Sequence, residues 1–157
     1  MLKQAIIIIF LFFLSRFIGL PANFSPLLAL AVYIPRISNH KAIKYFLPAA
    51  ILLGSNLFLE PVNSVILFSM TFVFLLTPFL SHFVSNLFLR TILSVLIWHL
   101  VVNGSVWMVS RGSLIETYLA AIPFDFSLLL STGLYVALFY ACEQIYFRIK
   151  FPVNEKI

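Results

Sequence analysis

The stretch LFLRTILSVLIWHLVVNGSVWMV occupies residues 87–109 and is apolar at almost every position. A helix needs about 20 residues to cross the hydrocarbon core of a bilayer, so this run is long enough to span one. The whole chain has the same character: 62% of its 157 residues are hydrophobic, 10% are charged, and the mean hydropathy is +1.10. These values lie far outside the range of soluble globular proteins. The chain is therefore predicted to be an all-α integral membrane protein.

Short gaps that contain charged or turn-forming residues divide the apolar sequence into six candidate membrane spans. They are predicted at residues 4–20, 25–39, 43–60, 62–81, 87–109 and 126–147. The second span is short for a crossing helix; Pro26 suits its first turn, and Pro35 would kink it near its end. The boundary between the third and fourth spans depends on Glu60 and Pro61, an acidic residue next to a helix breaker. The fold class is thus a polytopic bundle of about six transmembrane helices.

The distribution of basic residues predicts the orientation of this bundle, because cytoplasmic loops carry most Lys and Arg. If both termini are cytoplasmic, the outer side holds Arg16 and Arg111. The inner side then holds the other eight basic residues: Lys3, Arg36, Lys41, Lys44, Arg90, Arg148, Lys150 and Lys156. This asymmetry predicts a multi-pass protein of the bacterial cytoplasmic (inner) membrane. The net charge of +5 is explained by topology and by anionic lipid headgroups, and no charge run is long enough to suggest a nucleic-acid partner.

The amino terminus has a second interpretation, a secretory signal peptide, because Lys3 precedes an apolar run over residues 5–14. Leu20-Pro21-Ala22 is a poor cleavage sequence, which favours a retained span. The single cysteine, Cys142, excludes an internal disulfide framework and a cysteine-based metal cluster. The longest segment outside the membrane is predicted at residues 110–125, so residues 1–157 are expected to form one transmembrane helical domain with no metal or cofactor.

Polar residues recur at every fourth position through the end of the 87–109 run: His99, Asn103, Trp107 and Arg111. Residues four apart share a helix face, so these four are predicted to form a stripe from mid-membrane to the outer surface. Polar groups at that depth are costly against lipid and usually face the bundle interior. Each also has an ordinary structural explanation, such as a hydrogen-bonded core histidine or an interfacial tryptophan anchor. The stripe is either a binding site or a packing feature.

The start of the second predicted span adds a reason to expect an anionic ligand. Its first N–H groups, near Ser25, lack helical partners and give a partial positive end that attracts carboxylate or phosphate. Arg16 would add a full charge at the same level, and Asn23 and Asn56 would add polar groups there. Helix capping by Asn23 or Ser25 is the commoner use of such residues, and Asp125 is expected to cap the sixth helix in the same way.

Four elements together resemble an uncharacterised family of small bacterial integral membrane proteins with six helices. They are Arg16, Asn-Phe-Ser-Pro at 23–26, Asn-x-x-x-Trp at 103–107 and the Ala-Ile-Pro-Phe end of segment 118–124. The resemblance spans about residues 16–141.

The resemblance has one departure: members of that family carry acidic residues in helices three and six, where this chain has Asn56 and Thr132. It therefore does not imply a proton-coupled or cation-binding role. More distantly, the layout is similar to the substrate-binding subunits of energy-coupling factor vitamin transporters, which have six helices, cytoplasmic termini and an outward solute pocket. Those subunits usually carry small residues at spacing four in helix one, where this chain has large residues over 6–13. That likeness concerns the fold alone.

Catalytic motifs are missing from the sequence: it has no His-Glu-x-x-His, no Gly-x-Ser-x-Gly and no phosphate-binding glycine-rich loop. No catalytic residue is therefore assigned. Glu143, inside the sixth span, is predicted to pair with Arg148 or Lys150 or to reach the interface. A lipid-modifying enzyme that uses Asp125 and Arg111 is a minor alternative.

Two functions of different class remain open. The first is a solute-binding or transport-related subunit with an outward polar pocket, lined by Arg16, Asn23, Ser25, Asn56, His99, Asn103, Trp107 and Arg111. The second is a structural or accessory subunit of a larger membrane complex. Small residues at Gly133, Ala137 and Ala141 let another helix approach closely, and are predicted to form an internal packing seam or, alternatively, a partner interface.

Overall fold

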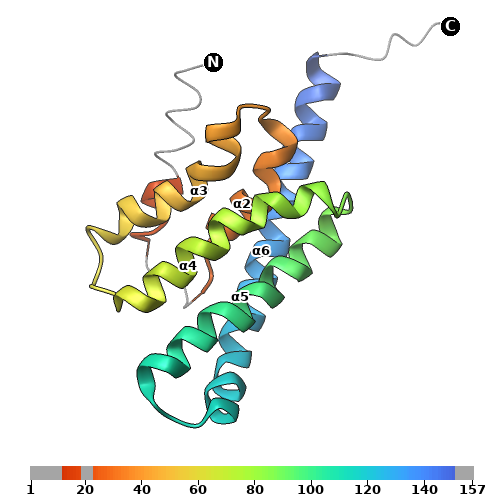
Figure 1. Cartoon of the computed structure of the whole chain (residues 1–157). Coiled ribbons are helices and arrows are strands. Elements are labelled where there is room, and N and C mark those ends of the chain that lie inside the picture. Colours follow the sequence, from red (N-terminus) through yellow and green to blue (C-terminus); the bar gives the residue numbers. More distant parts are fainter. Residues whose placement is uncertain (1–11, 19–22, 151–157) are drawn as a thin grey trace, which may run out of the picture.

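The computed structural model describes residues 12–18 and 23–150, with side chains to residue 146. Throughout these residues the regular structure is helical, as predicted (Figure 1). Most of the first predicted span, 4–20, lies outside the described residues. The remaining elements are α2 (Leu27–Ile37), α3 (Lys41–Asn56), α4 (Ser64–Leu76), the 3-10 helix η1 (Thr77–His82), α5 (Leu87–Ser110) and α6 (Leu114–Lys150).

Within the described residues, three stretches of helix are long and apolar enough to cross a membrane. They are α4 continued by η1 over Ser64–His82, α5, and α6 over Leu114–Tyr146. Their outward-facing side chains are mostly large and apolar, such as Phe68, Phe88 and Leu134, each more than half exposed. A water-exposed surface of this kind would be unusual, so these helices indicate a membrane protein.

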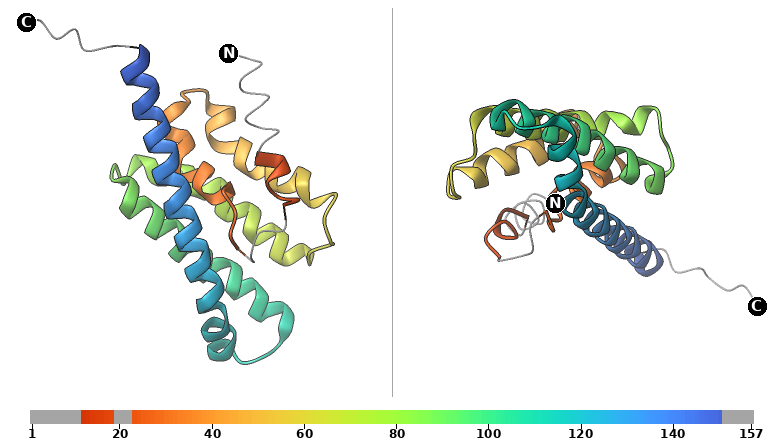
Figure 2. Two further views of the ribbon diagram at one scale, coloured as in Figure 1. Left: turned by 180° about the vertical axis from the view of Figure 1, so that it is seen from behind. Right: turned by 90° about the horizontal axis from the view of Figure 1, so that it is seen from below.

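Helix α2 is the core of the molecule. All residues from Leu27 to Ile34 are buried, and the helix packs against α3, α5, α6 and η1 (Figure 2). Its 11 residues rise only about 16 Å, half of the hydrocarbon thickness. An apolar sequence is expected for a helix surrounded by other helices, just as it is for one that faces lipid. The predicted second span, 25–39, is therefore a short central helix.

Successive helices run antiparallel and pack against their neighbours in the chain. In Figure 1 the connection at residues 38–40 lies toward the end of the molecule where α6 finishes, whereas the connection at 111–113 lies at the opposite end. Arg36 and Lys41 flank the first connection, and Arg111 lies in the second. Arg36 and Lys41 are thus at the opposite end of the bundle from Arg111, as expected if the two groups lie on opposite sides of the membrane.

Helix α6 differs most from the sequence prediction. It begins at Leu114, so the predicted loop 110–125 is wrong over most of its length. Its 37 residues extend about 55 Å, and its last turns project beyond the other helices (Figure 2). Pro123 lies inside the helix and has no N–H, so one backbone hydrogen bond is missing there. Transmembrane helices tolerate such a loss.

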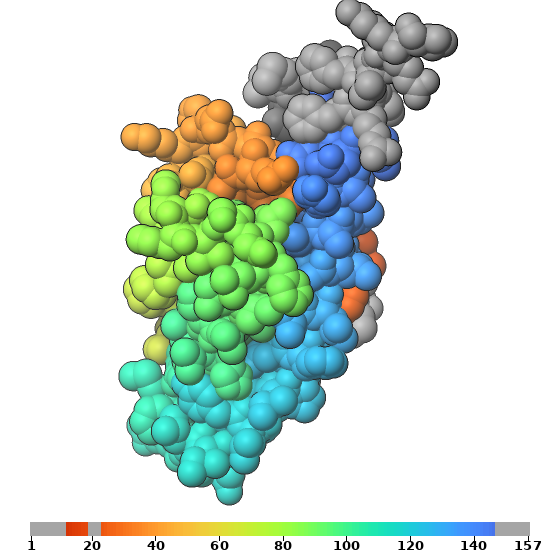
Figure 3. Space-filling view, turned by 90° about the vertical axis from the view of Figure 1, so that its right-hand side faces the viewer, coloured from red at the N-terminus to blue at the C-terminus, as the bar shows by residue number. Residues whose placement is uncertain are grey.

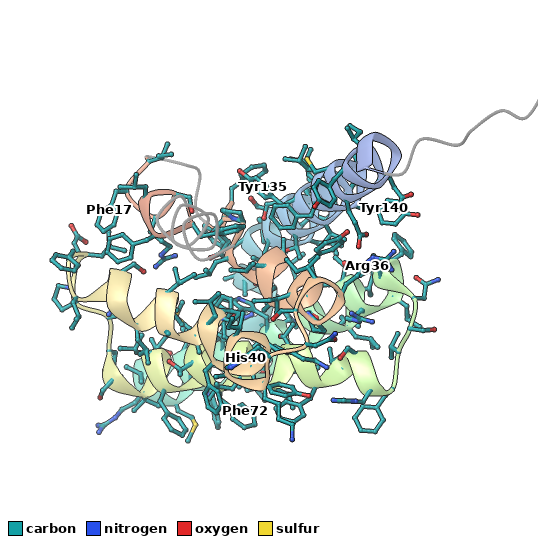
Figure 4. The ribbon with its side chains drawn as sticks, turned by 90° about the horizontal axis from the view of Figure 1, so that it is seen from above. Phe17, Arg36, His40, Phe72, Tyr135 and Tyr140 are labelled. Carbon is teal, nitrogen blue, oxygen red and sulfur yellow. The ribbon has the colours of Figure 1, made fainter. Side chains whose placement is uncertain are left out.

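The carboxyl-terminal half of α6 is tied to α2 by Glu143. Its Oε2 accepts hydrogen bonds from the Tyr33 hydroxyl at 2.7 Å and from Arg36 Nε at 2.6 Å. The Arg36 guanidinium also lies 5.4 Å from the ring centre of Tyr140 (Figure 4). The side chains of Arg148 and Lys150, the partners that the sequence predicts, lie outside the described residues; within them Glu143 is paired with Arg36 of the central helix.

The small residues of α6 face outward. Ala137 and Ala141 are exposed, and a Cβ placed on Gly133 would meet no atom within 4 Å. The inward face of the helix is formed instead by Leu128, Thr132 and Val136. The predicted internal seam is therefore wrong. Gly133 and Ala137 line an apolar groove of about 880 Å³ between α5 and α6, on the side where these helices lie next to each other in Figure 3.

Candidate functional site

A cavity of about 200 Å³ lies at the amino-terminal end of α2. Its polar lining comes from the segment before that helix: Ser15, Arg16, Asn23 and Ser25. Its apolar wall comes from five helices, α2 to α6, and includes Leu28, Leu52, Met70, Phe74, Trp98 and Leu128. Three of the predicted ligand-binding residues, Arg16, Asn23 and Ser25, therefore meet at one cavity.

Arg16 is the charged group of this cavity. Its Nε is buried and has no hydrogen-bond partner among the described residues. A buried guanidinium nitrogen without an acceptor is costly, and native structures rarely leave one in that state. Arg16 therefore has an unused donor at the cavity wall, which a carboxylate or phosphate oxygen would satisfy.

Ser25 and Asn23 hold the turn that enters α2. The Ser25 hydroxyl accepts a hydrogen bond from the Leu27 N–H at 3.3 Å, although the N-cap position of α2 is the next residue, Pro26. Asn23 has a positive φ of 61°, which Asn adopts more readily than most residues, and its carbonyl accepts a hydrogen bond from Ser131 of α6 at 3.4 Å. The next N–H groups, of Leu28 and Ala29, lack helical acceptors because of their position in the first turn. The positive end of the α2 dipole thus adjoins the cavity.

A second polar site joins α5 to α6 deep in their interface. The Oδ2 of Asp125 lies 2.7 Å from His99 Nδ1 and 2.7 Å from Asn103 Nδ2. The two nitrogens are 3.1 Å apart, and Asp125 is only 6% exposed. Asp125 is therefore an interior residue of α6 and not its cap, so the capping prediction is wrong. His99 and Asn103 do share an inward face, as predicted, and Asp125 is the partner that the sequence interpretation missed.

The outer half of the predicted stripe does not reach either site. Trp107 is 38% exposed, and its indole N–H donates to the Gly112 carbonyl at 3.1 Å. Arg111 is exposed and ends α5 with a positive φ of 55°. Asn56 ends α3 and does not line the cavity. The prediction that Trp107 is shielded is wrong, and Trp98 takes its place as the indole at the cavity wall.

The two sites share their supporting helices. Trp98 lines the cavity and is adjacent in sequence to His99, while Leu128 lines the cavity one turn after Asp125. Over residues 12–18 and 23–150, no three His, Cys, Asp or Glu side chains are grouped so that they could hold a metal ion.

The family-model comparison places almost the whole chain in one family. Residues 2–153 match the model of DUF6580, a family of unknown function, and the chain belongs to that family. A search of curated proteins finds no match, and no solved structure matches the chain.

Proposed function

We propose that this DUF6580 protein is a multi-pass protein of the bacterial cytoplasmic membrane that binds a small anionic solute, such as a carboxylate, in the cavity at the start of α2. In this proposal it acts as a solute-binding or transport-related subunit. The observation that carries the proposal is the buried Nε of Arg16, which lines the cavity and has no acceptor among the described residues. A ligand with an anionic oxygen would supply that acceptor.

The surroundings of the cavity favour a negative charge over a neutral ligand. The first N–H groups of α2 give its amino end a partial positive charge, and Arg16 adds a full one. Helix amino termini that begin within a membrane bundle serve in the same way for the anionic groups of transported substrates. The apolar wall, including Phe74 and Trp98, would contact the remaining part of a small solute. At about 200 Å³ the cavity is smaller than the usual site for a drug-sized molecule, which favours a compact solute.

In this proposal both termini are cytoplasmic and the chain crosses the membrane six times, as the charge asymmetry predicts. The second crossing is made by residues 23–37, in which the segment before α2 extends the short helix. This topology places the α2 cavity toward the outer side, on the side of Arg16. The distant likeness in layout to the substrate-binding subunits of energy-coupling factor transporters supports an outward pocket. It does not identify a partner, because residues 6–11 of the helix-one segment lie outside the described residues.

Ligand-dependent thermal unfolding tests the solute proposal. The probes are small monocarboxylates, dicarboxylates and inorganic phosphate, added to the purified full chain. A probe that binds only the folded state stabilises it by about 2.7 kcal/mol at 100 times its dissociation constant. We expect Arg16→Gln to weaken the binding of that probe by about 10- to 100-fold, because a hydrogen bond to a charged group contributes about 1.5–3 kcal/mol.

Arg111→Gln is the matched control for this experiment. It removes the same type of side chain on the same predicted side of the membrane, but outside the cavity lining. The response of this variant should equal that of the parent. Equal responses in Arg16→Gln and the parent, or no response to any anion in the parent, would count against the proposal.

A second function, an accessory subunit, is supported by a different observation. Gly133, Ala137 and Ala141 are accessible along α6, next to the α5–α6 groove, where a partner helix could approach closely. Native mass spectrometry of the protein extracted from its own membrane distinguishes the two functions. A retained small anion supports the first. A stoichiometric second chain that is lost in Ala137→Leu supports the second.

A further inference from the structure

The contact between His99 and Asp125 constrains how many protons this pair carries. The distance of 2.7 Å between Nδ1 and Oδ2 is that of a hydrogen bond. One proton must therefore lie between the two atoms. If neither atom carried a proton, the lone pairs of the nitrogen and the oxygen would face each other and repel. With no further proton the imidazole is neutral, the carboxylate is ionised, and the pair has a net charge of −1.

One additional proton makes the same pair neutral. It is added at Nε2 and leaves an imidazolium beside a carboxylate; equivalently, the shared proton moves to Oδ2 beside a neutral imidazole. Both arrangements keep the Nδ1–Oδ2 hydrogen bond. The pair can therefore take up and release one proton without breaking the contact between α5 and α6.

The surroundings of the pair favour its neutral state. The side chains of Asp125 and His99 are 8% and 24% exposed, in two helices that are apolar enough to cross a membrane. An uncompensated negative charge is costly in such a place. From α6, the Tyr118 ring lies edge-on at 5.1 Å from the imidazole, and its hydroxyl is engaged by the Leu100 carbonyl.

Within the described part of the chain, no cation from a neighbouring helix is paired with the carboxylate. Among the described residues, no side chain of α2, α4 or η1 forms a hydrogen bond or ion pair with His99 or Asp125. Asn103, on α5, donates its amide to Oδ2 and fixes the carboxylate against the ring. The charge of the pair therefore depends on its protons alone.

We propose that His99 and Asp125 form a proton-binding site inside the bundle, with Asn103 as its positioning residue. The other acid of α6, Glu143, is different because its partner is a guanidinium, which does not lose its proton in proteins. A proton at the new site lies on the two helices that also carry Trp98 and Leu128 to the cavity wall. The site is thus suited to a proton that accompanies a solute, although the proposal does not depend on the solute.

Nitrogen-15 NMR of histidine-labelled protein in lipid bilayers tests the site, because the ring nitrogens report which of them carries a proton. Signals of His99 are assigned by their loss in His99→Gln. Infrared spectra of carboxyl-labelled aspartate report whether Asp125 is protonated. Between about pH 9 and about pH 5, where histidines ordinarily change charge, we expect the parent pair to gain one proton while Nδ1 remains hydrogen-bonded.

Two substitutions on α6 separate this site from ordinary histidine titration. Asp125→Asn should abolish the gain of a proton at His99, because an imidazolium would lose its counter-charge. Glu143→Gln should leave the gain unchanged. The same gain in Asp125→Asn as in the parent would overturn the proposal. If Asp125→Asn does not fold, the parent spectra decide the question: an unchanged proton count across this pH range overturns the proposal as well.

Discussion

Tyr33 donates its hydroxyl hydrogen to the carboxylate of Glu143, with 2.7 Å between the two oxygens, and so joins α2 to α6 across 110 positions of sequence. Tyr33 is 2% exposed, whereas the Arg36 side chain that shares the same carboxylate is 42% exposed. The contact anchors the carboxyl-terminal end of the central helix. The amino-terminal end of α2 is at the cavity. The position of α2 therefore links the Glu143 contact to the cavity.

Removal of the Glu143 carboxylate should therefore destabilise the fold. We expect Glu143→Ala to lower the free energy of unfolding by about 1–3 kcal/mol, because the buried Tyr33 hydroxyl loses its acceptor. The double variant with Tyr33→Phe should be less destabilised than the sum of the single variants, since the two residues form one contact. Glu116→Ala, at the exposed start of α6, should change stability by less than about 0.5 kcal/mol. Unfolding in detergent measures the parent, the two single variants, the double variant and the control, and additive effects would contradict the expectation.

Arg90 should resist replacement by lysine. It is 6% exposed, and its guanidinium donates to the carbonyls of Val84 at 2.8 Å and Val32 at 3.2 Å. Arg90 therefore connects the turn before α5 to the central helix α2 by hydrogen bonds. A lysine has no planar fork and cannot reach both carbonyls in this geometry. We expect Arg90→Lys to lower the free energy of unfolding by about 1–3 kcal/mol. Lys44→Arg, at a partly exposed position on α3, is the control and should have little effect.

The parts of the fold that the sequence predicts well are those determined locally. Helix α5 runs from Leu87 to Ser110, against a predicted span of 87–109. Its apolar run is bounded by Asn86, whose side chain caps the helix by accepting from the Leu89 N–H at 3.1 Å. The polar positions His99 and Asn103 were found because helical spacing alone puts them on one face.

The parts that could not be predicted depend on contacts between distant segments. Asp125 and Pro123 are typical of a loop, and only the donors from α5 explain why an acid lies within α6. Helix α2 was assigned as a span because apolar periodicity does not distinguish a buried core helix from one that faces lipid. The sequence could not show whether Trp98 or Trp107 lines the cavity, because the cavity wall is assembled from several helices.

Gly104 should not accept a side chain. A Cβ at this position would lie 3.0 Å from the Tyr118 hydroxyl, which is held by its 2.7 Å hydrogen bond to the Leu100 carbonyl. Although alanine favours helix over glycine, we expect Gly104→Ala to lower the melting temperature, because the hydroxyl must shift and its hydrogen bond to Leu100 is strained. Tyr118→Phe removes the obstructing atom, so Gly104→Ala should be neutral or stabilising in that background. A Gly104→Ala variant that melts above the parent would contradict this expectation.

The orientation of the bundle can be tested at two connections that lie at opposite ends of it. Asn39 is in the connection between α2 and α3, flanked by Arg36 and Lys41, whereas Ser113 follows Arg111 between α5 and α6. Because basic residues are retained on the cytoplasmic side, we expect Asn39→Cys to be inside and Ser113→Cys to be outside. Both variants are made with Cys142→Ser, so that the native thiol does not react.

A membrane-impermeant maleimide applied to intact cells should then label Ser113→Cys at once and Asn39→Cys only after the membrane is opened. Labelling of both variants after denaturation is the control that each thiol is reactive. The antiparallel packing of α3, α4 and α5 requires the two connections to face opposite sides if all three helices cross the membrane. Labelling of Asn39→Cys alone in intact cells would reverse the orientation and put the Arg16 cavity on the cytoplasmic side. Labelling of both variants in intact cells would instead mean that at least one of these helices does not cross.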